Sequence, residues 1–540
     1  MKLNKWLFST GIATLTLVLA SCGTQSSSKK QDKTLSVTAT QAMATADPDK
    51  ADDVVSQEAI AQFMEGLYTT NTHGKVVPAI ATKVVKPTNG GKTYTFNLRH
   101  NAKWSNGAPV TAADFVYSFQ RQVNPKTKSQ EVGHVAEIQN ATAITKGKKA
   151  VSTLGVKALG KYKLQIKLIQ KVPYFNYRLA TELYPLNQKF TEKYGNKYGT
   201  SAKTTLANGP YVLKGWNGTN DTWSYSRNAK YYDKKAVRIK TVKVQTVKTN
   251  TTAQNMFESN AVQVTQITGT QVADAKQGAL KKQLKITKLN QLYFMLWNQK
   301  RTELKNTALR QAVSYALNRQ SLAKNVLKDG SVAAKSLVPT GNTKNPATGK
   351  DFNADTGNLY PYSPAKAKEY WQKAQDSLGT KHLTLQLLTN DNDINKSVAE
   401  YIQAAIEKNL KGVTVNVKSV PLTNEISTLN KGNFDFATLG WSSDFQDPVD
   451  FLNKASITNS VDFGKFNDPQ YEALIKTIAA GTQSKTDRYQ TMQAAAKMIA
   501  EKQGVTPLYQ TSAAHLVSSK VGGVHVTLLR DVLYRYAYWK

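Results

Sequence analysis

A carboxylate, two large aromatic rings and a glycine lie close together within residues 434–448. This segment begins as an apolar strand and ends in a polar, turn-forming part, with Asp444 between Trp441 and Phe445. Gly440 has no Cβ, so a second backbone can come close to it. A strand followed by a partly desolvated acid predicts a site for an extended ligand with a cationic end. A strand ending in a Trp and an Asp-Pro turn is also common in α/β proteins without any ligand, and this alternative stays open.

The elements that must position this segment follow from the spacing of apolar residues. Residues 35–39 alternate as a strand, residues 52–67 change from extended to helical, and residues 93–99 alternate again. Thr111 is expected to cap a helix, with Asp114 three residues later as in a capping box. A later helix would place its apolar residues on one face: Leu309, Ala312, Val313, Ala316 and Leu317. Strands and helices therefore mix along the chain, which predicts an α/β protein.

The chain is long and basic. Its 540 residues are enough for two or three domains. The 72 Lys and Arg residues against 37 Asp and Glu give a net charge of +35, which favours adsorption to polyanions such as anionic lipid, wall polymers or nucleic acid. The lysines are scattered as singles and pairs, with no zinc-finger spacing and no basic helix of the kind that reads a DNA groove. We therefore interpret the charge as a solvated surface and expect no nucleic-acid partner.

The amino terminus has the pattern of an export signal. Lys2 and Lys5 precede an apolar stretch of about 15 residues, shorter than the roughly 20 of a membrane-spanning helix. Small residues then precede Cys22 in Leu-Ala-Ser-Cys, which resembles the bacterial lipobox. We expect residues 1–21 to be a lipoprotein signal peptide, Cys22 to be acylated, and residues 22–34 to be a flexible tether at the outer face of the cell membrane. Because Cys22 is the only cysteine, we expect no disulfide and no cysteine nucleophile.

One long motif runs from Tyr94 to Ser118 and contains Lys-Trp-Ser-Asn-Gly-Ala-Pro-Val-Thr-Ala-Ala-Asp-Phe-Val-Tyr-Ser. Shorter motifs are Val172-Pro173-Tyr174-Phe175, Asn208–Leu213 with Arg227–Tyr232, Leu309–Arg319 after Asn298-Gln299, and Gly440–Asp444. As a set, these motifs strongly resemble the oligopeptide-binding lipoproteins of peptide ABC transporters, in family 5 of the extracellular solute-binding proteins. The resemblance covers nearly the whole exported chain.

The resemblance implies an α/β fold with two lobes, of the periplasmic-binding-protein type and class II. The first lobe would be discontinuous and carry an inserted subdomain. The ligand would lie in a cleft between the lobes, which would close on it by a hinge motion. The implied ranges are 35–64, 204–295 and 515–540 for the first lobe, 65–203 for the inserted subdomain, and 296–514 for the second lobe.

The same resemblance implies how a peptide would be held. An extended peptide would add as a strand to exposed main-chain edges in the cleft. The residues that would supply these edges are Asp52 and Val54 in the first lobe and Gly440 and Ser442 in the second. Asp444 would bind the α-ammonium group of the peptide, and Trp441 would form the wall of a side-chain pocket.

Some relatives place cationic side chains where the carboxyl end of a short peptide lies. The matching positions here are Asn395, Leu429 and Thr438, none of which is cationic. We include Asn395 among the expected peptide-binding residues. We also expect a site that does not hold the C-terminus of a short peptide, so that longer peptides bind at least as well as tripeptides.

Patterns of catalytic chemistry are weak in this sequence. The six histidines form no His-Glu-x-x-His motif and no tight cluster, so we interpret them as surface or core residues. Gly91-Lys92-Thr93 looks like the end of a phosphate loop, but Lys86 stands where the first glycine of that loop is required. No Gly-x-Ser-x-Gly nucleophile elbow is present. We expect a protein that is not an enzyme and has no cofactor and no metal site.

These patterns and the resemblance predict a monomeric receptor that captures oligopeptides outside the cytoplasm and delivers them to the permease and ATPase subunits of an ABC transporter. The alternative is a basic cell-surface adhesin or wall-polymer-binding lipoprotein, whose binding should fade at high ionic strength. A third hypothesis keeps the fold but changes the ligand, because the wider family also carries dipeptides, metal chelates and sugars. Asp444 favours a peptide amine over these.

Overall fold

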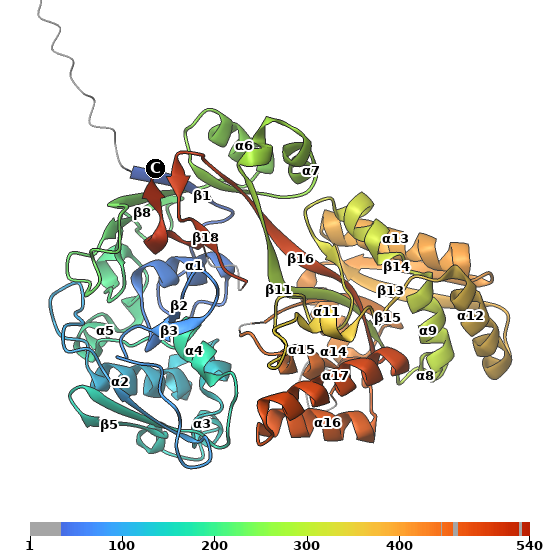
Figure 1. Ribbon diagram of the computed structural model, residues 1–540, viewed down its shortest axis with the longest axis horizontal. Coiled ribbons are helices and arrows are strands. Elements are labelled where there is room, and N and C mark those ends of the chain that lie inside the picture. The colour runs from blue at the N-terminus through green and yellow to red at the C-terminus, as the bar shows by residue number, and fades with distance from the viewer. Residues whose placement is uncertain (1–33, 444, 457–462, 529–531) are drawn as a thin grey trace, which may run out of the picture. The chain divides into compact units, whose positions relative to one another are not determined.

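The computed structural model describes residues 34–443, 445–456, 463–528 and 532–540. Residues 34–540 form one compact unit. The main element is an 11-stranded sheet in the order β14-β13-β15-β11-β16-β10-β1-β9-β8-β7, with β12 paired to β16 (Figure 1). Its strands are β1 (Thr34–Ala39), β7 (Tyr211–Lys214), β8 (Thr222–Arg227), β9 (Thr241–Thr246), β10 (Val264–Ile267), β11 (Leu284–Trp297), β12 (Val332–Ala333), β13 (Leu383–Asn390), β14 (Val413–Val420), β15 (Phe436–Ser442) and β16 (Val505–Val517).

Two long strands connect the halves of this sheet. β11 and β16 contain 14 and 13 residues, and their antiparallel pairing shifts register between Lys288 and Leu292 and again between Tyr293 and Phe294. On one side of these shifts, the C-terminal part of β16 pairs with β10. On the other side, the C-terminal part of β11 pairs with β15. Both strands therefore belong to both halves, as a two-lobed fold requires. The predicted lobe borders after residues 295 and 514 fall within these strands, and the ranges themselves stay a prediction.

Helices pack around the large sheet and around the smaller sheets of the first half of the chain (Figure 1). Those before β11 are α1 (Val54–Phe63), α2 (Ala112–Val123), α3 (Ala141–Thr145), α4 (Phe175–Thr181), α5 (Gln188–Tyr194), α6 (Asn250–Glu258) and α7 (Thr270–Gln277). Those after it are α8 (Thr302–Lys305), α9 (Thr307–Ala316), α10 (Arg319–Ser321), α11 (Phe352–Thr356), α12 (Pro364–Leu378), α13 (Asp393–Asn409), α14 (Leu422–Lys431), α15 (Val449–Leu452), α16 (Pro469–Ala480) and α17 (Lys485–Lys502). No helix in the described part of the chain is both long and apolar enough to cross a bilayer.

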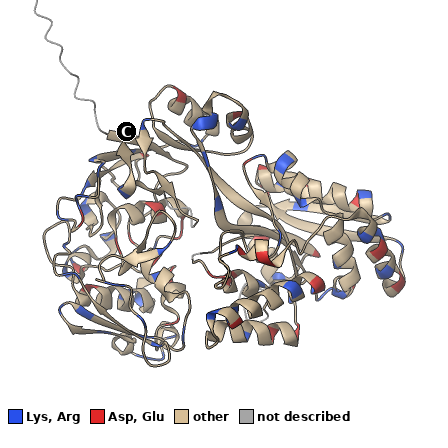
Figure 2. Ribbon diagram, viewed as in Figure 1, with Lys and Arg blue, Asp and Glu red and all other residues tan. Residues whose placement is uncertain are grey.

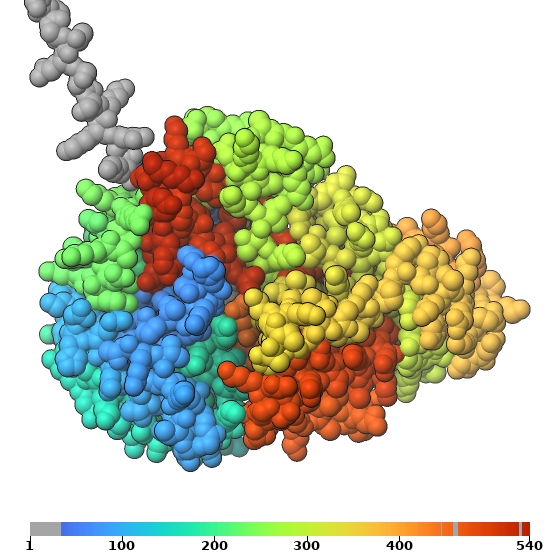
Figure 3. Space-filling view, in the orientation of Figure 1, coloured from blue at the N-terminus to red at the C-terminus, as the bar shows by residue number. Residues whose placement is uncertain are grey.

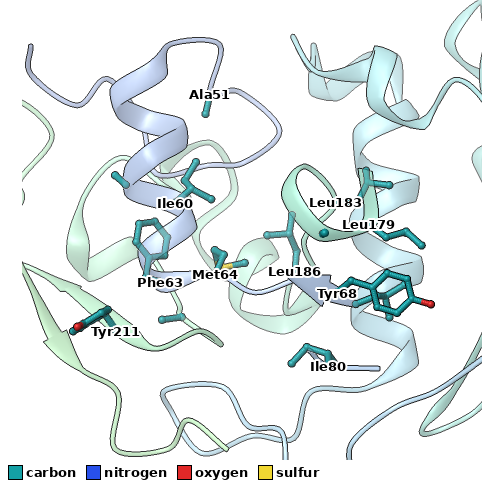
Figure 4. Packing of buried hydrophobic residues seen from close by; sticks show 14 of the residues in the cluster. Ala51, Ile60, Phe63, Met64, Tyr68, Ile80, Leu179, Leu183, Leu186 and Tyr211 are labelled. Atoms are coloured by element: carbon teal, nitrogen blue, oxygen red, sulfur yellow. The ribbon is translucent and has the colours of Figure 1, made fainter. Parts of the chain in front are cut away.

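The predicted inserted segment has small sheets of its own. β4 (Thr93–Asn97), β6 (Lys163–Lys167) and β5 (Val156–Gly160) form one, and β2 (Tyr68–Thr70) pairs with β3 (Val76–Pro78) in another. A shared core joins this segment to α1. Ile60 and Phe63 from α1 belong to the same buried cluster as Leu179 and Leu183 from the end of α4 and the loop after it (Figure 4).

The C-terminal residues pack beside segments from the first half of the chain. Tyr211 in β7 donates a hydrogen bond from its hydroxyl to the Tyr534 carbonyl at 3.2 Å. The space-filling view shows the C-terminal segment, in red, with green segments of residues near 200–290 on either side (Figure 3). Four short strands pair in this region: β17 (Val521–Gly522) with β20 (Tyr538–Trp539), and β18 (His525–Val526) with β19 (Val532–Leu533).

Several elements predicted from the sequence are present. The strand expected at 35–39 is β1, and the capping box of Thr111 and Asp114 opens α2. α9 contains four of the five apolar residues expected on its face and Leu317 follows as its C-cap; each of the five is at most 1% exposed. Two element boundaries differ from the prediction. The strand expected from Phe434 begins at Phe436, and the helix expected to reach Leu67 ends at Phe63.

Candidate binding site

A cavity of about 360 Å³ lies where three distant segments meet. The first is the start of α1, the second comes from the predicted inserted subdomain, and the third is the end of β15. The lining residues are Pro48, Ala51, Asp52, Val54, Gln57, Glu58 and Ile60; Glu131, His134, Thr181, Glu182 and Tyr184; and Trp441, Ser442 and Ser443. The volume is at the low end of the roughly 300–1,000 Å³ typical of small-molecule pockets.

The end of β15 has an edge beside this cavity that pairs with no other strand in the described part of the chain. The Ser443 amide donates to the Asn290 carbonyl at 3.0 Å, and β15 pairs with β11 in an unbroken antiparallel register. Because peptide groups alternate between the two edges of a strand, Trp441 faces β11, whereas Gly440 and Ser442 face the opposite edge. On that edge β13 is in register with only the first two residues of β15. The main chain at Gly440 and Ser442 is therefore in the position that the addition of a peptide strand requires.

Gly440 leaves room for a side chain of the neighbouring strand. A Cβ at this position would lie 2.7 Å from the Tyr293 ring of the neighbouring strand. Tyr293 is itself stacked on Tyr509, with ring centroids 4.9 Å apart. The missing side chain therefore makes room for a ring of the protein's own sheet, and the open edge of β15 is the direction from which a ligand backbone can approach.

Trp441 is held by two charged residues after β15. Its indole Nε1 donates to Asp450 Oδ2 at 2.8 Å, and Lys454 Nζ lies 3.4 Å from the centroid of the indole ring. Lys454 also forms an ion pair with the other oxygen of Asp450 at 3.2 Å. Both charged side chains are buried. The ring that lines the cavity is thus fixed both at its polar edge and on one face.

The main chain at Asp52 and Val54, the expected first-lobe edge, lies where the extended chain changes into α1. Asp53 is the N-cap of α1 and accepts a hydrogen bond from the Ser56 amide at 2.9 Å, so Val54 is the first helical residue. Asp52 and Val54 are exposed and line the cavity. The first-lobe wall therefore includes the N-terminal turn of a helix, and the peptide contacts expected from Asp52 and Val54 stay a prediction.

Residues of the inserted segment add a charged network to the cavity. His134 Nε2 lies 2.9 Å from Glu131 and 3.7 Å from Glu182, and Arg178 Nη1 binds Glu182 at 2.6 Å. Burial disfavours the charge on His134, but the carboxylates of Glu182 and Glu131 outweigh it and raise its pKa to about 9. His134 is therefore protonated at neutral pH. Glu137 also approaches Arg178, at 3.4 Å.

An aromatic stack joins the inserted segment to the loop after β15. Tyr174 and Phe445 stack with ring centroids 3.9 Å apart and planes 11° apart, and the Arg178 guanidinium lies 5.1 Å from the centroid of the Phe445 ring. Such contacts are worth about 0.5–1.5 kcal/mol beyond their buried area. They favour an arrangement in which the walls of the cavity lie close together.

The structure brings only part of the predicted site together. Asp52, Val54, Trp441 and Ser442 line the cavity, and Gly440 lies on the same strand.

Asn395 lies in α13, is 2% exposed and is not among the lining residues; Leu429 and Thr438 are also buried. Asp444 and Cys22 lie outside the described residues. The roles predicted for all of these residues stay predictions.

Sequence reasoning missed Glu131, His134 and Glu182. Their spacing has no motif, and the histidines were interpreted as surface or core residues. Only the packing of residues 131–134 against 181–184 places these groups on the cavity. Within the described ranges, no three His, Cys, Asp or Glu side chains are grouped as a metal ion would need.

Comparisons with known proteins agree with this architecture. The family model described as "Bacterial extracellular solute-binding proteins, family 5 Middle" matches residues 75–463. A "Dipeptide-binding protein" of Lactococcus lactis is 33% identical over 482 residues, covering 87% of this chain and 86% of its own length. The "Oligopeptide-binding protein OppA" of Bacillus subtilis is 28% identical and covers 99% of this chain and 100% of its own.

A solved structure described as "Listeria monocytogenes OppA bound to peptide" has a TM-score of 0.76 and 31% identity to this chain. The match covers 94% of this chain and 99% of the Listeria chain. The fold is therefore the two-lobed one of these solute-binding proteins. The chain belongs to family 5 of the bacterial extracellular solute-binding proteins.

Proposed function

We propose that this protein is an extracytoplasmic receptor that captures oligopeptides and delivers them to the permease and ATPase subunits of an ABC transporter. The observation that carries the proposal is the edge of β15 at Gly440 and Ser442, which no described strand pairs with and which lies beside a cavity shared with α1. Main-chain hydrogen bonds along such an edge are the same for every peptide, so they supply affinity without selecting side chains. The peptide-binding names of the relatives from Lactococcus, Bacillus and Listeria support it.

The amino end of the peptide would be bound by Asp444, two residues beyond the end of β15. A buried ion pair stabilises a complex mainly when both partners are present, and removal of one partner costs about 3–5 kcal/mol. The α-ammonium group is common to all peptides with a free amino end. This anchor therefore fits a receptor with little sequence selectivity.

Calorimetric titration of the full-length chain in detergent tests this function. The ligands are a mixed-sequence pentapeptide and its N-acetylated twin. We expect the free-amine peptide to bind and the acetylated peptide to bind at least 100-fold more weakly, with the same loss for the free peptide in Asp444→Ala. Equal binding of the two peptides would remove Asp444 as the anchor, and no binding of either would refute the peptide receptor. A tripeptide and an octapeptide then test whether longer peptides bind at least as well.

Lipid anchoring at Cys22 is part of the same proposal. The Leu-Ala-Ser-Cys sequence and the basic, apolar start of the chain support it. Cys22→Ser should release the protein from the membrane fraction into the medium, and mass spectrometry of the natural protein should find acyl chains on Cys22. An unmodified Cys22 in the membrane fraction would contradict the anchor.

The net charge of +35 favours one competing function, a basic adhesin or wall-polymer binder. Binding through scattered lysines weakens as salt shortens the Debye length from about 30 Å at 0.01 M to about 8 Å at 0.15 M. Binding of purified cell-wall polymer that falls steeply over this range, together with no binding of peptides, would favour the competing function.

A further inference from the structure

The solvent-facing side of the small β4-β6-β5 sheet is basic. Successive side chains of a strand point to opposite faces. In β6, Lys163 and Lys167 are exposed, Gln165 between them is half-buried, and the two residues that alternate with them are buried. Lys157 of β5 is exposed and is the register partner of Gln165. Three lysines therefore surround one glutamine on the same outer face, and none of the three forms an ion pair with a described residue.

The segments that build this sheet contain no acidic residue. Residues 66–113 supply β4, and residues 138–181 supply β5 and β6. Together they hold 13 Lys, 2 Arg and no Asp or Glu, although the whole chain has 37 acids. Blue segments mark lysines of this sheet at the lower left of Figure 2. α2 packs against β5, and Asp114, the acid of this helix, is buried in the capping box. The sheet therefore has no carboxylate of its own to balance the lysines.

Two large apolar side chains lie at the ends of the same face. Ile169 continues the alternation two residues after Lys167 and is 58% exposed. Leu159 lies in the register shift at the end of β5 and is 49% exposed. Single exposed apolar residues are ordinary. Beside lysines, however, such side chains can enter the boundary between lipid headgroups and acyl chains, while the ammonium groups stay at the headgroups. A soluble polyanion would gain nothing from them.

We infer that this lysine face is an interaction surface for a bilayer that contains anionic lipid. The lysine face consists of Lys157, Lys163, Lys167, Leu159 and Ile169. It lies outside the residues that line the peptide cavity, and it goes beyond the proposed function. Each lysine near an anionic bilayer raises the affinity about fivefold, so three lysines give roughly a hundredfold. That gain is modest for a protein free in solution, but it is enough to orient one that a lipid anchor already keeps at the membrane.

The position of the lysine face predicts how the receptor would lie. β1, where the described chain begins, and β5 lie at opposite ends of the left-hand half in Figure 1. The proposed tether that precedes β1, residues 22–33, reaches at most about 40 Å when it is fully extended. Attachment through the tether at one end and through the lysine face at the other would hold this half lengthwise along the bilayer.

Lysine footprinting of the full-length protein tests this contact. The protein is added from detergent to preformed vesicles of phosphatidylcholine alone, or of two parts phosphatidylcholine to one part phosphatidylglycerol. A reagent that does not cross membranes acetylates accessible lysines, and mass spectrometry gives the rate at each position. We expect Lys157, Lys163 and Lys167 to react at least threefold more slowly on the anionic vesicles at about 0.01 M salt, and this protection to disappear at about 1 M salt.

Three exposed lysines in the second half of the chain serve as internal controls. They are Lys368 on α12, Lys408 on α13 and Lys418 on β14. Their rates should be the same on both kinds of vesicle. This comparison holds whether or not the amino terminus itself keeps the protein on the vesicles, because the lipid composition is the one variable that changes.

Variants then assign the protection to the lysine face. The double variant Leu159→Gln and Ile169→Gln should reduce the protection of the three lysines at least twofold. The triple variant Lys157→Gln, Lys163→Gln and Lys167→Gln should abolish the protection of Lys161, which lies in the turn between β5 and β6. Its matched control changes Lys368, Lys408 and Lys418 to Gln, which removes the same charge and should leave Lys161 protected. Peptide affinity should stay within twofold in all three variants, which shows that they are folded.

Three results would overturn the inference. Equal rates at the lysine face on both kinds of vesicle, or a protein that stays on neither, would refute the contact. Equal slowing of the control lysines would show adsorption through the net charge of +35 instead of through this face. Protection by a purified anionic wall polymer on neutral vesicles, with none from anionic lipid, would assign the face to the polymer and refute the bilayer. None of these results bears on the peptide receptor, whose titrations use a different part of the molecule.

Discussion

The position of the Trp441 ring should depend on the ion pair between Asp450 and Lys454. A double-mutant cycle can measure how strongly these two charges are coupled. The two charges are 3.2 Å apart and both side chains are at most 11% exposed. At an effective dielectric constant of about 20, their attraction is about 5 kcal/mol, before the cost of desolvation. Asp450→Asn keeps an oxygen for the Trp441 indole but leaves the Lys454 ammonium without this carboxylate. Lys454→Met keeps an unbranched stem over the ring but removes the charge.

Each single variant should lower the free energy of unfolding by about 3 kcal/mol, because each breaks a buried ion pair. The double variant should lose clearly less than the sum, with a coupling energy of at least about 2 kcal/mol. Urea unfolding of the four proteins gives these values, and peptide titration of the same proteins shows whether the position of Trp441 affects binding. Losses that add to within about 0.5 kcal/mol would refute the coupling.

Two further predictions concern Gly440 in β15 and the buried Glu425 in α14. Gly440→Ala should lower the free energy of unfolding by about 1–3 kcal/mol, because the new Cβ would meet the Tyr293 ring at 2.7 Å and that ring is stacked on Tyr509; urea unfolding at wild-type stability would contradict this. Burial raises the pKa of Glu425 from 4.5 to about 7, against a smaller opposing effect of a hydrogen bond to Asn390. The folded protein therefore holds the Glu425 proton more tightly than the unfolded chain does. The stability that this proton contributes is complete below pH 4.5 and is lost as the pH rises to about 7. Glu425→Gln should therefore stabilise the protein by about 2 kcal/mol at pH 8, after allowance for solvent screening, and by little at pH 4; an equal effect at both pH values would refute the burial argument.

Local patterns in the sequence determine much of the fold. The capping box of Thr111 and Asp114 and the apolar face of α9 depend on neighbours three or four residues away, so periodicity is enough to find them. The first and last residues of helices and strands are harder to predict from sequence. The helix expected to reach Leu67 ends at Phe63, because Met64 leaves the helix in an extended conformation while staying buried. The motifs from Tyr94 to Ser118 and at Gly440–Asp444 led to the correct family, because a set of short motifs in fixed order is specific.

The sequence by itself determined that the chain is an α/β protein of this family and that the end of β15 is a candidate site. It could not show why Gly440 is a glycine, since the ring that covers it comes from β11, more than a hundred residues earlier. The charged network of Glu131, His134 and Glu182 was also beyond it. These residues have no motif, and their position on the cavity results from long-range packing that brings the inserted segment against α1 and β15. Tertiary structure alone brought these charged groups together, because charges separated along the chain act on one another strongly only once folding removes the water between them.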